Sequence, residues 1–292
     1  LRGAVVFLAI VVNTAGCCLP LFALALVKLA VPLPRPRRAL GAALTVIAET
    51  WIAVNNKILA LTQSIAWEVR GIDGLDRRAW YLVIANHRSW VDIFALQAVF
   101  NRRVPFLKFF LKDQLKWVPV MGLAWWALDM PFMKRYSRAE LERRPELRGK
   151  DLETTRRACE RFKQVPTSVM NFVEGTRFSE GKRERLQSPY RHLLPPRAGG
   201  VAFVLSAMGG MLHSMVDVTI AYRETSPTMW DLCCGRLQTV QVAVERRPIE
   251  AWTTQGDYQE DEAFRRRFQQ WLAELWSRKD AQLATMLQPG QS

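Results

Sequence analysis

The chain has 292 residues, and 49% of them are hydrophobic, enough to fill one large core or two small ones. Its 41 Lys and Arg against 27 Asp and Glu give a formal net charge of +14, which favours a polyanionic partner, either nucleic acid or a membrane face. Eleven Trp against five Tyr favour the membrane, because Trp collects at bilayer interfaces. The five cysteines, two adjacent pairs and a single residue, fit neither a disulfide framework nor a zinc site and favour reduced thiols in a cytosol-facing protein.

The N-terminal segment carries no charge from residue 4 to residue 27, which is long enough to cross a bilayer. A secretory signal peptide is the alternative, and the residues before Cys17 faintly resemble a lipoprotein cleavage site. The apolar run continues past Cys17, however, so we expect a membrane segment. The chain opens on Leu1, which suggests a natural start further upstream. The proline-rich basic stretch at residues 32–38 is predicted to be a cytoplasmic loop.

A second apolar stretch covers residues 39–67 and contains four polar side chains, Glu49, Asn55, Asn56 and Lys57. It could be a second span, a re-entrant arm or an interfacial helix. If both segments crossed the bilayer fully, the rest of the chain would lie outside, whereas an interfacial second arm keeps it on the cytoplasmic side. We favour the interfacial arm. The sequence thus predicts a membrane-associated helical hairpin in residues 1–66 and a separate domain in residues 67–292.

The second domain alternates short strand patterns with helical ones, which is typical of an α/β fold. The predicted strands cover residues 66–70, 80–85, 104–111, 128–133, 167–173, 215–222 and 237–244. The predicted helices cover residues 90–100, 119–126, 151–162 and 198–208, and Asp151 is the expected N-cap of the third. Residues 134–150 form a charged connection rich in Arg.

The C-terminal segment is the clearest amphipathic helix of the sequence. Its apolar face contains Phe264, Phe268, Trp271, Leu272, Leu275 and Trp276. Its opposite face is basic, with three consecutive arginines at residues 265–267. We expect this helix to pack against the domain, and contact with lipid is the alternative.

A histidine and an aspartate five residues apart follow the strand predicted at residues 80–85. His87 leaves this strand, and Asp92 lies where the next helix begins. The turn between them would hold a base beside a carboxylate that orients it. Such a pair occurs by chance in many chains, so by itself it favours a structural histidine with a local acidic partner over a catalytic one.

The segment Asn86-His87-Arg88-Ser89-Trp90-Val91-Asp92 has the form NHxxxxD, and further blocks follow it at Gly122 and at residues 132–135, 172–177 and 217–222. In order and spacing these blocks closely resemble the glycerolipid acyltransferase family, which includes the 1-acylglycerol-3-phosphate acyltransferases. The chain is most similar to a branch of bacterial inner-membrane acyltransferases allied to lysocardiolipin acyltransferases. The resemblance implies a mixed sheet flanked by helices, behind an N-terminal membrane-anchoring hairpin. Val173 replaces the usual proline and Met133 the usual isoleucine, and prolines common in the last block are missing.

Acyl transfer from a thioester to an alcohol requires that the alcohol lose its proton as it attacks. Within the resemblance, His87 is the general base, because imidazole titrates near neutral pH. Asp92 would accept a hydrogen bond from the other ring nitrogen and stabilise the imidazolium, as in serine hydrolase triads. The substrate hydroxyl takes the place of the serine, so no acyl-enzyme is required. His192 and His213 lack such neighbours and are predicted to be structural.

The resemblance also implies a site for the acceptor's phosphate. The predicted substrate-binding residues are Arg135, Glu174, Gly175, Thr176 and Arg177. Guanidinium groups bind phosphate oxygens in pairs, which favours Arg135 and Arg177 as the phosphate ligands. Glu174 cannot bind phosphate and is expected to orient an arginine or an acceptor hydroxyl. Gly175 would permit a tight turn, and Arg197 is a weaker candidate for a further phosphate contact.

The predicted function is transfer of a fatty acyl chain from acyl-CoA or acyl carrier protein to a lysophospholipid, foremost 1-acyl-sn-glycerol 3-phosphate. Lysocardiolipin and lysophosphatidylglycerol are alternative acceptors. A basic, membrane-tethered protein without catalysis is the alternative of another class. No cofactor, metal or nucleic acid is expected: the sequence has no GxGxxG or Walker loop, and the setting of Cys159 indicates core packing. The predicted location is the cytoplasmic face of a bacterial inner membrane.

Overall fold

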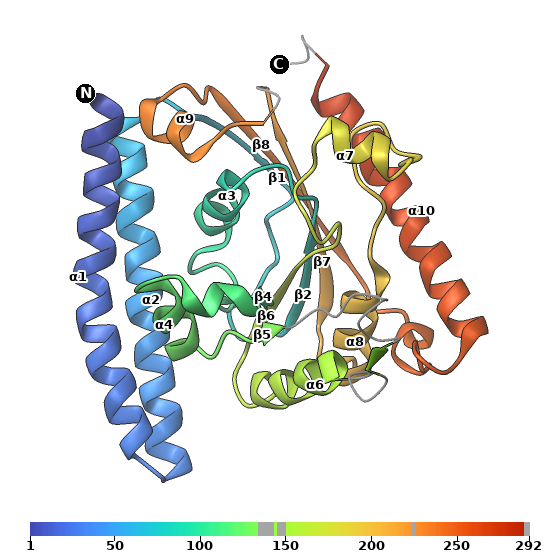
Figure 1. The fold of residues 1–292 in the computed structure, drawn as a ribbon, viewed down its shortest axis with the longest axis horizontal. Coiled ribbons are helices and arrows are strands. Elements are labelled where there is room, and N and C mark those ends of the chain that lie inside the picture. Colours follow the sequence, from blue (N-terminus) through green and yellow to red (C-terminus); the bar gives the residue numbers. More distant parts are fainter. Residues whose placement is uncertain (134–142, 145–149, 224–225, 289–292) are drawn as a thin grey trace.

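The computed structural model describes residues 1–133, 143–144, 150–223 and 226–288. It begins with two helices of 29 residues each, α1 (Arg2–Ala30) and α2 (Pro34–Thr62). They lie side by side along one edge of the molecule (Figure 1). Both are long and apolar enough to cross a membrane by length and composition. The basic stretch that we predicted to be a loop belongs mostly to α2, because proline is well suited to the first helical turn.

The rest of the chain is built around a six-stranded sheet, which confirms the predicted α/β class. The strand order is β1-β8-β7-β2-β6-β3. Among these described strands every pairing is parallel except that of β7 with β8, so the sheet is mixed, as expected. The strands are β1 (Ala66–Arg70), β2 (Tyr81–Ala85), β3 (Leu107–Phe109), β6 (Ser168–Phe172), β7 (Ser214–Tyr222) and β8 (Thr239–Arg247).

Strand β2 is fully buried at the centre of the sheet, as its unbroken apolar sequence predicts. Its side chains alternate between two hydrophobic cores. Tyr81, Val83 and Ala85 point into the first core, which includes residues of α1, α2 and α3 (Val91–Phe100). Leu82 and Ile84 point into the second core. That core is covered by α6 (Lys150–Phe162), α8 (Ala198–Met208) and α10 (Glu262–Met286). The carboxyl end of β2 thus emerges between two packed layers (Figure 1).

A small unit links the first core to the hairpin. It consists of the short strands β4 (Leu111–Lys112) and β5 (Phe132–Met133), the 3-10 helix η1 (Asp113–Trp117) and α4 (Met121–Ala127). Gly122 permits the close packing of η1 on α4, since a Cβ there would lie 2.2 Å from the carbonyl oxygen of Lys116. Helix α4 packs against α1, and residues of both join one apolar cluster.

Two predicted strands were wrong in their extent. The strand expected at residues 128–133 is reduced to β5, because its first residues continue the last turn of α4: the N–H of Leu128 bonds to Ala124, and the N–H of Met130 bonds to Trp125. Asp129 has a φ of 56° there, which interrupts any extended run. The strand expected at residues 104–111 is divided between β3 and β4, which belong to different sheets.

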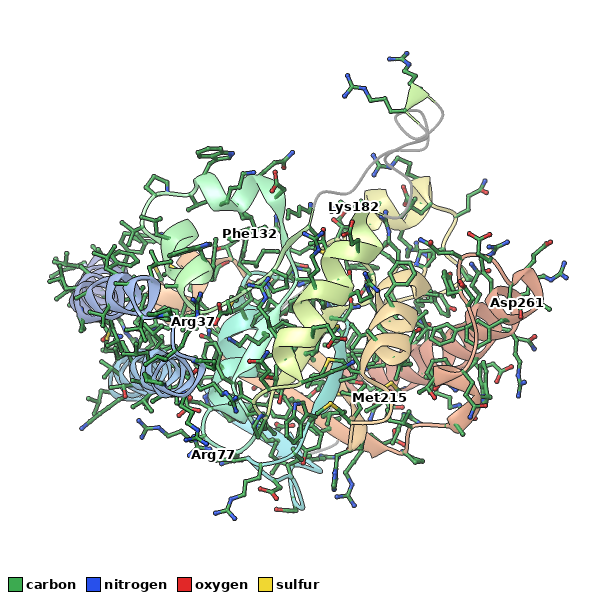
Figure 2. All side chains as sticks on the ribbon, turned by 90° about the horizontal axis from the view of Figure 1, so that it is seen from below. Arg37, Arg77, Phe132, Lys182, Met215 and Asp261 are labelled. Atoms are coloured by element: carbon green, nitrogen blue, oxygen red, sulfur yellow. The ribbon has the colours of Figure 1, made fainter. Side chains whose placement is uncertain are left out.

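The C-terminal helix packs on the domain, as expected. Phe268, Leu272 and Trp276 of α10 are fully buried in the second core. Figure 2 shows that Asp261, which caps this helix, lies at the opposite end of the molecule from Arg37 of the hairpin. Helix α6 begins at Lys150, so the expected cap Asp151 is already helical. The short helices α7 (Glu180–Arg185), α9 (Met229–Cys234) and η3 (Ala251–Thr254) were not predicted, because segments so short carry no periodic signal.

Candidate active site

His87 and Asp92 meet in the turn between the end of β2 and the start of α3. Nδ1 of His87 donates to Oδ2 of Asp92 over 2.7 Å. The Asp92 side chain is fully buried, whereas 15% of the His87 side chain is exposed. Because Nδ1 carries the proton of this bond, Nε2 is the basic nitrogen of the neutral ring. The pair therefore has the geometry that a general base and its orienting carboxylate require.

Asp92 is held by three further donors. The backbone N–H groups of Arg88 and Ser89 donate to Oδ2 over 2.7 and 2.9 Å. The hydroxyl of Tyr222, at the end of β7, donates to Oδ1 over 2.6 Å. Burial and the nearby charge of Asp92 raise the pKa of Tyr222 well above its ordinary value, so this hydroxyl keeps its proton. Sequence reasoning gave Tyr222 no role, since only the pairing of β2 with β7 brings it to Asp92.

The imidazole of His87 stacks on Phe172, the last residue of β6. The ring centroids are 4.0 Å apart and the planes are inclined by 16°. The preceding residue, Asn86, is fixed by two hydrogen bonds with the backbone of Ile220 on β7, each 2.9 Å long. The strands on both sides of β2 thus determine where the histidine points.

Glu174 does not take the position that the sequence predicted. It is 1% exposed and does not line the cavity beside His87. Its Oε1 accepts from the backbone N–H of His87 over 2.8 Å, and its Oε2 accepts from that of Leu194 over 2.9 Å. Burial raises the pKa of this carboxyl to about 7. We therefore correct the expectation of substrate contact: Glu174 holds the backbone of the histidine.

Gly175, Thr176 and Arg177, three of the predicted substrate-binding residues, follow at the cavity wall. Gly175 has a φ of 68°, a conformation that favours glycine. The guanidinium of Arg177 lies 4.8 Å above the ring of Trp90, which fixes its direction. The amine of Lys182 donates to Thr176 Oγ1 over 3.0 Å and to the carbonyl oxygen of Arg177 over 2.8 Å. This turn therefore brings two cations together, and the sequence did not single out Lys182.

The remaining predicted residues lie in different surroundings. Arg135 falls outside the described residues. Arg197 lines the same cavity as His87 and Arg177. His192 and His213 do not line it. Among the described residues, no group of three or more His, Cys, Asp or Glu is placed to hold a metal ion.

A cavity of about 850 Å³ connects this polar site to the helical hairpin. His87, Arg177 and Lys112 contribute polar groups to its wall. The rest is mainly apolar and includes side chains of α1, α2, α3 and α4, such as Cys17, Leu21, Ala48, Phe94 and Trp125. Such a space suits a molecule with a small anionic head and a long hydrocarbon chain.

A family model described as Acyltransferase matches residues 66–223, which contain all of the predicted site residues. An Arabidopsis thaliana protein named 1-acyl-sn-glycerol-3-phosphate acyltransferase 3 is 27% identical over 218 residues, covering 69% of this chain and 52% of that protein. The human 1-acyl-sn-glycerol-3-phosphate acyltransferase delta is 25% identical over 214 residues, covering 68% and 51%. The chain therefore spans about half the length of the curated relatives that it matches.

The fold also matches a crystal structure, that of the 1-acyl-sn-glycerophosphate (LPA) acyltransferase PlsC from Thermotoga maritima. The TM-score is 0.58 with 14% sequence identity, and the match covers 100% of this chain and 98% of that one. At this identity the likeness concerns the fold, and it extends over the hairpin as well as the sheet.

Proposed function

The chain belongs to the Acyltransferase family, and we propose that it is a membrane-bound enzyme that acylates a lysophospholipid. The proposed acceptor is 1-acyl-sn-glycerol 3-phosphate, the product is phosphatidate, and the donor is acyl-CoA or acyl carrier protein. One observation carries the proposal: His87, which the buried Asp92 orients, and Arg177, which stacks on Trp90, line the same mainly apolar cavity. The names of the relatives support this acceptor.

In the proposed reaction, Nε2 of His87 takes the proton from the acceptor's free hydroxyl as its oxygen attacks the thioester carbonyl. Collapse of the tetrahedral intermediate breaks the C–S bond and forms the new ester. The leaving thiolate then takes the proton from the imidazolium, so the protein ends unchanged. Asp92 stabilises the imidazolium and keeps Nδ1 protonated throughout.

The phosphate of the acceptor is proposed to bind Arg177. Its side chain is exposed at the cavity wall, and its stacking on Trp90 reduces the conformational freedom that would be lost on binding. Lys182 and Lys112 add positive charge nearby. Desolvation lowers the pKa of Lys182, and the charges of Arg177, Arg185 and Lys112 lower it further. An anion at this point would relieve the repulsion among the cations.

The hairpin supports a location on one face of a membrane. Helix α1 would be about 44 Å long at 1.5 Å per residue, and it contacts the domain at both ends. Near its start it packs against α9, and near its end Lys28 forms an ion pair of 2.6 Å with Asp129. Because the domain contacts the hairpin at both ends, the hairpin fits insertion into one leaflet better than a full crossing of the bilayer. Insertion into one leaflet is also what an interfacial second arm requires. We place the active site on the cytoplasmic face of a bacterial inner membrane.

The surface beside the hairpin supports the same orientation. Between residues 117 and 126, five large apolar side chains are exposed, Trp117 (78%), Val118 (38%), Val120 (46%), Leu123 (59%) and Trp126 (49%). Met121 and Trp125 of this segment line the cavity on its other side. A segment that is apolar on both sides fits a position between the cavity and lipid. Lys112 and Lys116, both exposed, would face anionic head groups.

Acyl transfer by the purified protein in detergent tests the chemical proposal. We expect phosphatidate from 1-acyl-sn-glycerol 3-phosphate, with either acyl-CoA or acyl carrier protein as donor. Lysocardiolipin, lysophosphatidylglycerol and a lysolipid without phosphate serve as parallel acceptors. If no acceptor is acylated, the proposed activity is wrong. If only another phosphate-bearing lysolipid reacts, the proposed acceptor is wrong.

Tryptophan quenching by brominated lipids tests the orientation. Trp117→Phe and Trp126→Phe should reduce the fraction of fluorescence that vesicles of brominated anionic phospholipid quench. Trp67→Phe is the matched control, because Trp67 is 39% exposed but lies on β1, away from this surface. Equal quenching in all three variants would contradict contact between this surface and lipid.

A further inference from the structure

A short loop lies between the C-terminal helix and the catalytic turn. This loop, residues 190–194, contacts Glu174 through the N–H of Leu194, over 2.9 Å. Arg88, the residue after the proposed base, donates to the carbonyl oxygen of His192 over 3.3 Å. The loop therefore touches the histidine turn directly at Arg88, and it reaches the backbone of His87 indirectly through Glu174.

Helix α10 holds this loop from its other side. Oδ1 and Oδ2 of Asp280 accept from the backbone N–H groups of His192 and Arg191, over 2.7 and 2.9 Å. The indole N–H of Trp276 donates to the carbonyl oxygen of Leu194 over 3.1 Å. Trp276 is fully buried, so this bond cannot be exchanged for one with water. A carboxylate that accepts two consecutive N–H groups fixes both the position and the direction of the loop.

The contacts join into one continuous series. It begins at Asp280 on α10, passes through the loop to Leu194, continues to Glu174 and ends at the backbone N–H of His87. Glu174 is 1% exposed, and each of its oxygens has one backbone donor in this series. If the loop moved, one oxygen of Glu174 would lose its partner, which is unfavourable for a buried polar group. The loop and the histidine backbone are thus coupled through a single carboxylate.

We propose that Asp280 and Trp276 are positioning residues for His87, acting through the loop at residues 190–194 and through Glu174. This inference rests on the proposed function of His87 and extends it to a helix outside the matched residues 66–223. Figure 1 shows α10 on the side of the sheet opposite α1 and α2. Helix α10, which covers the second core, thus also determines how the imidazole of His87 is oriented. Neither residue touches substrate, so their loss lowers the rate without changing the affinity for the acceptor.

The first experiment compares Asp280→Ala with milder substitutions and with a matched control on the same helix. Asp280→Ala should lower kcat about five- to tenfold and leave the KM for the acceptor within twofold. Asp280→Asn keeps one oxygen for one of the two N–H groups, so its loss should be smaller. Trp276→Phe removes the indole donor and should lower kcat about twofold to threefold. The control is Glu274→Ala, which removes an exposed carboxylate from the same helix and should leave kcat unchanged.

A double-mutant cycle distinguishes positioning from a general loss of stability. If Asp280 acts through Glu174, the effect of Asp280→Ala on kcat should nearly vanish in a Glu174→Gln background. If Asp280→Ala lowers kcat by the same factor in the Glu174→Gln background as in the wild type, the proposal is overturned. An Asp280→Ala variant with a kcat within twofold of the wild type would also overturn it.

Ring NMR signals provide a readout that does not depend on activity. The chain has three histidines, so the signals of His87 can be assigned by their loss in His87→Ala. Asp280→Ala should shift the His87 ring signals, whereas Glu274→Ala should leave them unchanged. An unchanged His87 spectrum would overturn the proposal, even if the protein acylated none of the acceptors tested.

Discussion

The two ends of the cavity are built in different ways. At the polar end, Asp92 accepts four hydrogen bonds and Glu174 accepts two, so directional bonds determine where His87 lies. At the hairpin end, apolar side chains such as Cys18, Leu21 and Ala48 form the wall by packing against one another. Packing restricts the volume that a ligand can occupy, whereas hydrogen bonds restrict the direction in which a side chain points. Substitutions at the first end should therefore change rates and pH dependence, and those at the second should change which chains are accepted.

The largest expected effect is loss of the base. His87→Ala should lower kcat about 10³-fold, because positioned general bases contribute about 10²–10⁴-fold. The partly exposed ring is not a core side chain, so the melting temperature should remain close to that of the wild type. Initial rates with saturating donor and acceptor measure the loss. His213→Ala is the control, since His213 is exposed and does not line the cavity. A His87→Ala variant within tenfold of the wild type would rule out the proposed role.

The second prediction concerns pH and the buried carboxyl of Glu174. Its pKa in the folded protein is raised from 4.5 to about 7 by burial, so the folded state holds this proton more tightly than the unfolded state. Its contribution to the free energy of unfolding is therefore complete below pH 4.5 and is lost as the pH rises through 7. The shift corresponds to a loss on the order of 3 kcal/mol.

Glu174→Gln removes this titration. The variant should be less stable than the wild type at pH 5, because its amide can accept only one of the two backbone N–H groups. Its free energy of unfolding should decline less than that of the wild type between pH 5 and pH 8. Chemical denaturation at both pH values measures the difference. Identical pH slopes in the two proteins would show that Glu174 does not titrate in this range.

The sequence predicted the polar end far better than its surroundings. His87 and Asp92 are close in the chain, so a strand followed by a helix is enough to bring them together. Tyr222 and Leu194 reach the site only through the sheet order and the path of a loop, and no local pattern encodes either. Glu174 was wrongly expected to face substrate, because the sequence shows a carboxylate but not which side of the turn it faces. The apolar pattern of α1 and α2 predicted the hairpin. It did not predict that α4 would line the same cavity as these two helices.

The third prediction tests the anionic head group at the polar end. Arg177→Lys keeps the charge but loses the planar fork and the stacking on Trp90. The KM for the acceptor should rise about tenfold, while kcat and the KM for the donor change little. Initial rates at varied acceptor concentration measure this. Arg185→Lys, on the short helix α7, is a control that should behave like the wild type. A change confined to the KM for the donor would assign Arg177 to the other substrate.

The smallest expected effect concerns the hairpin end of the cavity, where the available volume limits which acyl chains fit. Cys17 lines the cavity from α1, so Cys17→Phe should shorten the space available to a hydrocarbon chain. Donors with long acyl chains should lose about fivefold in kcat/KM, whereas short-chain donors should react at the wild-type rate. The neighbouring Gly16→Phe is the matched control, because a Cβ at Gly16 meets nothing within 4 Å and the residue does not line the cavity. A uniform loss across chain lengths would mean that this end also influences the chemistry, and the contrast between the two ends would then fail.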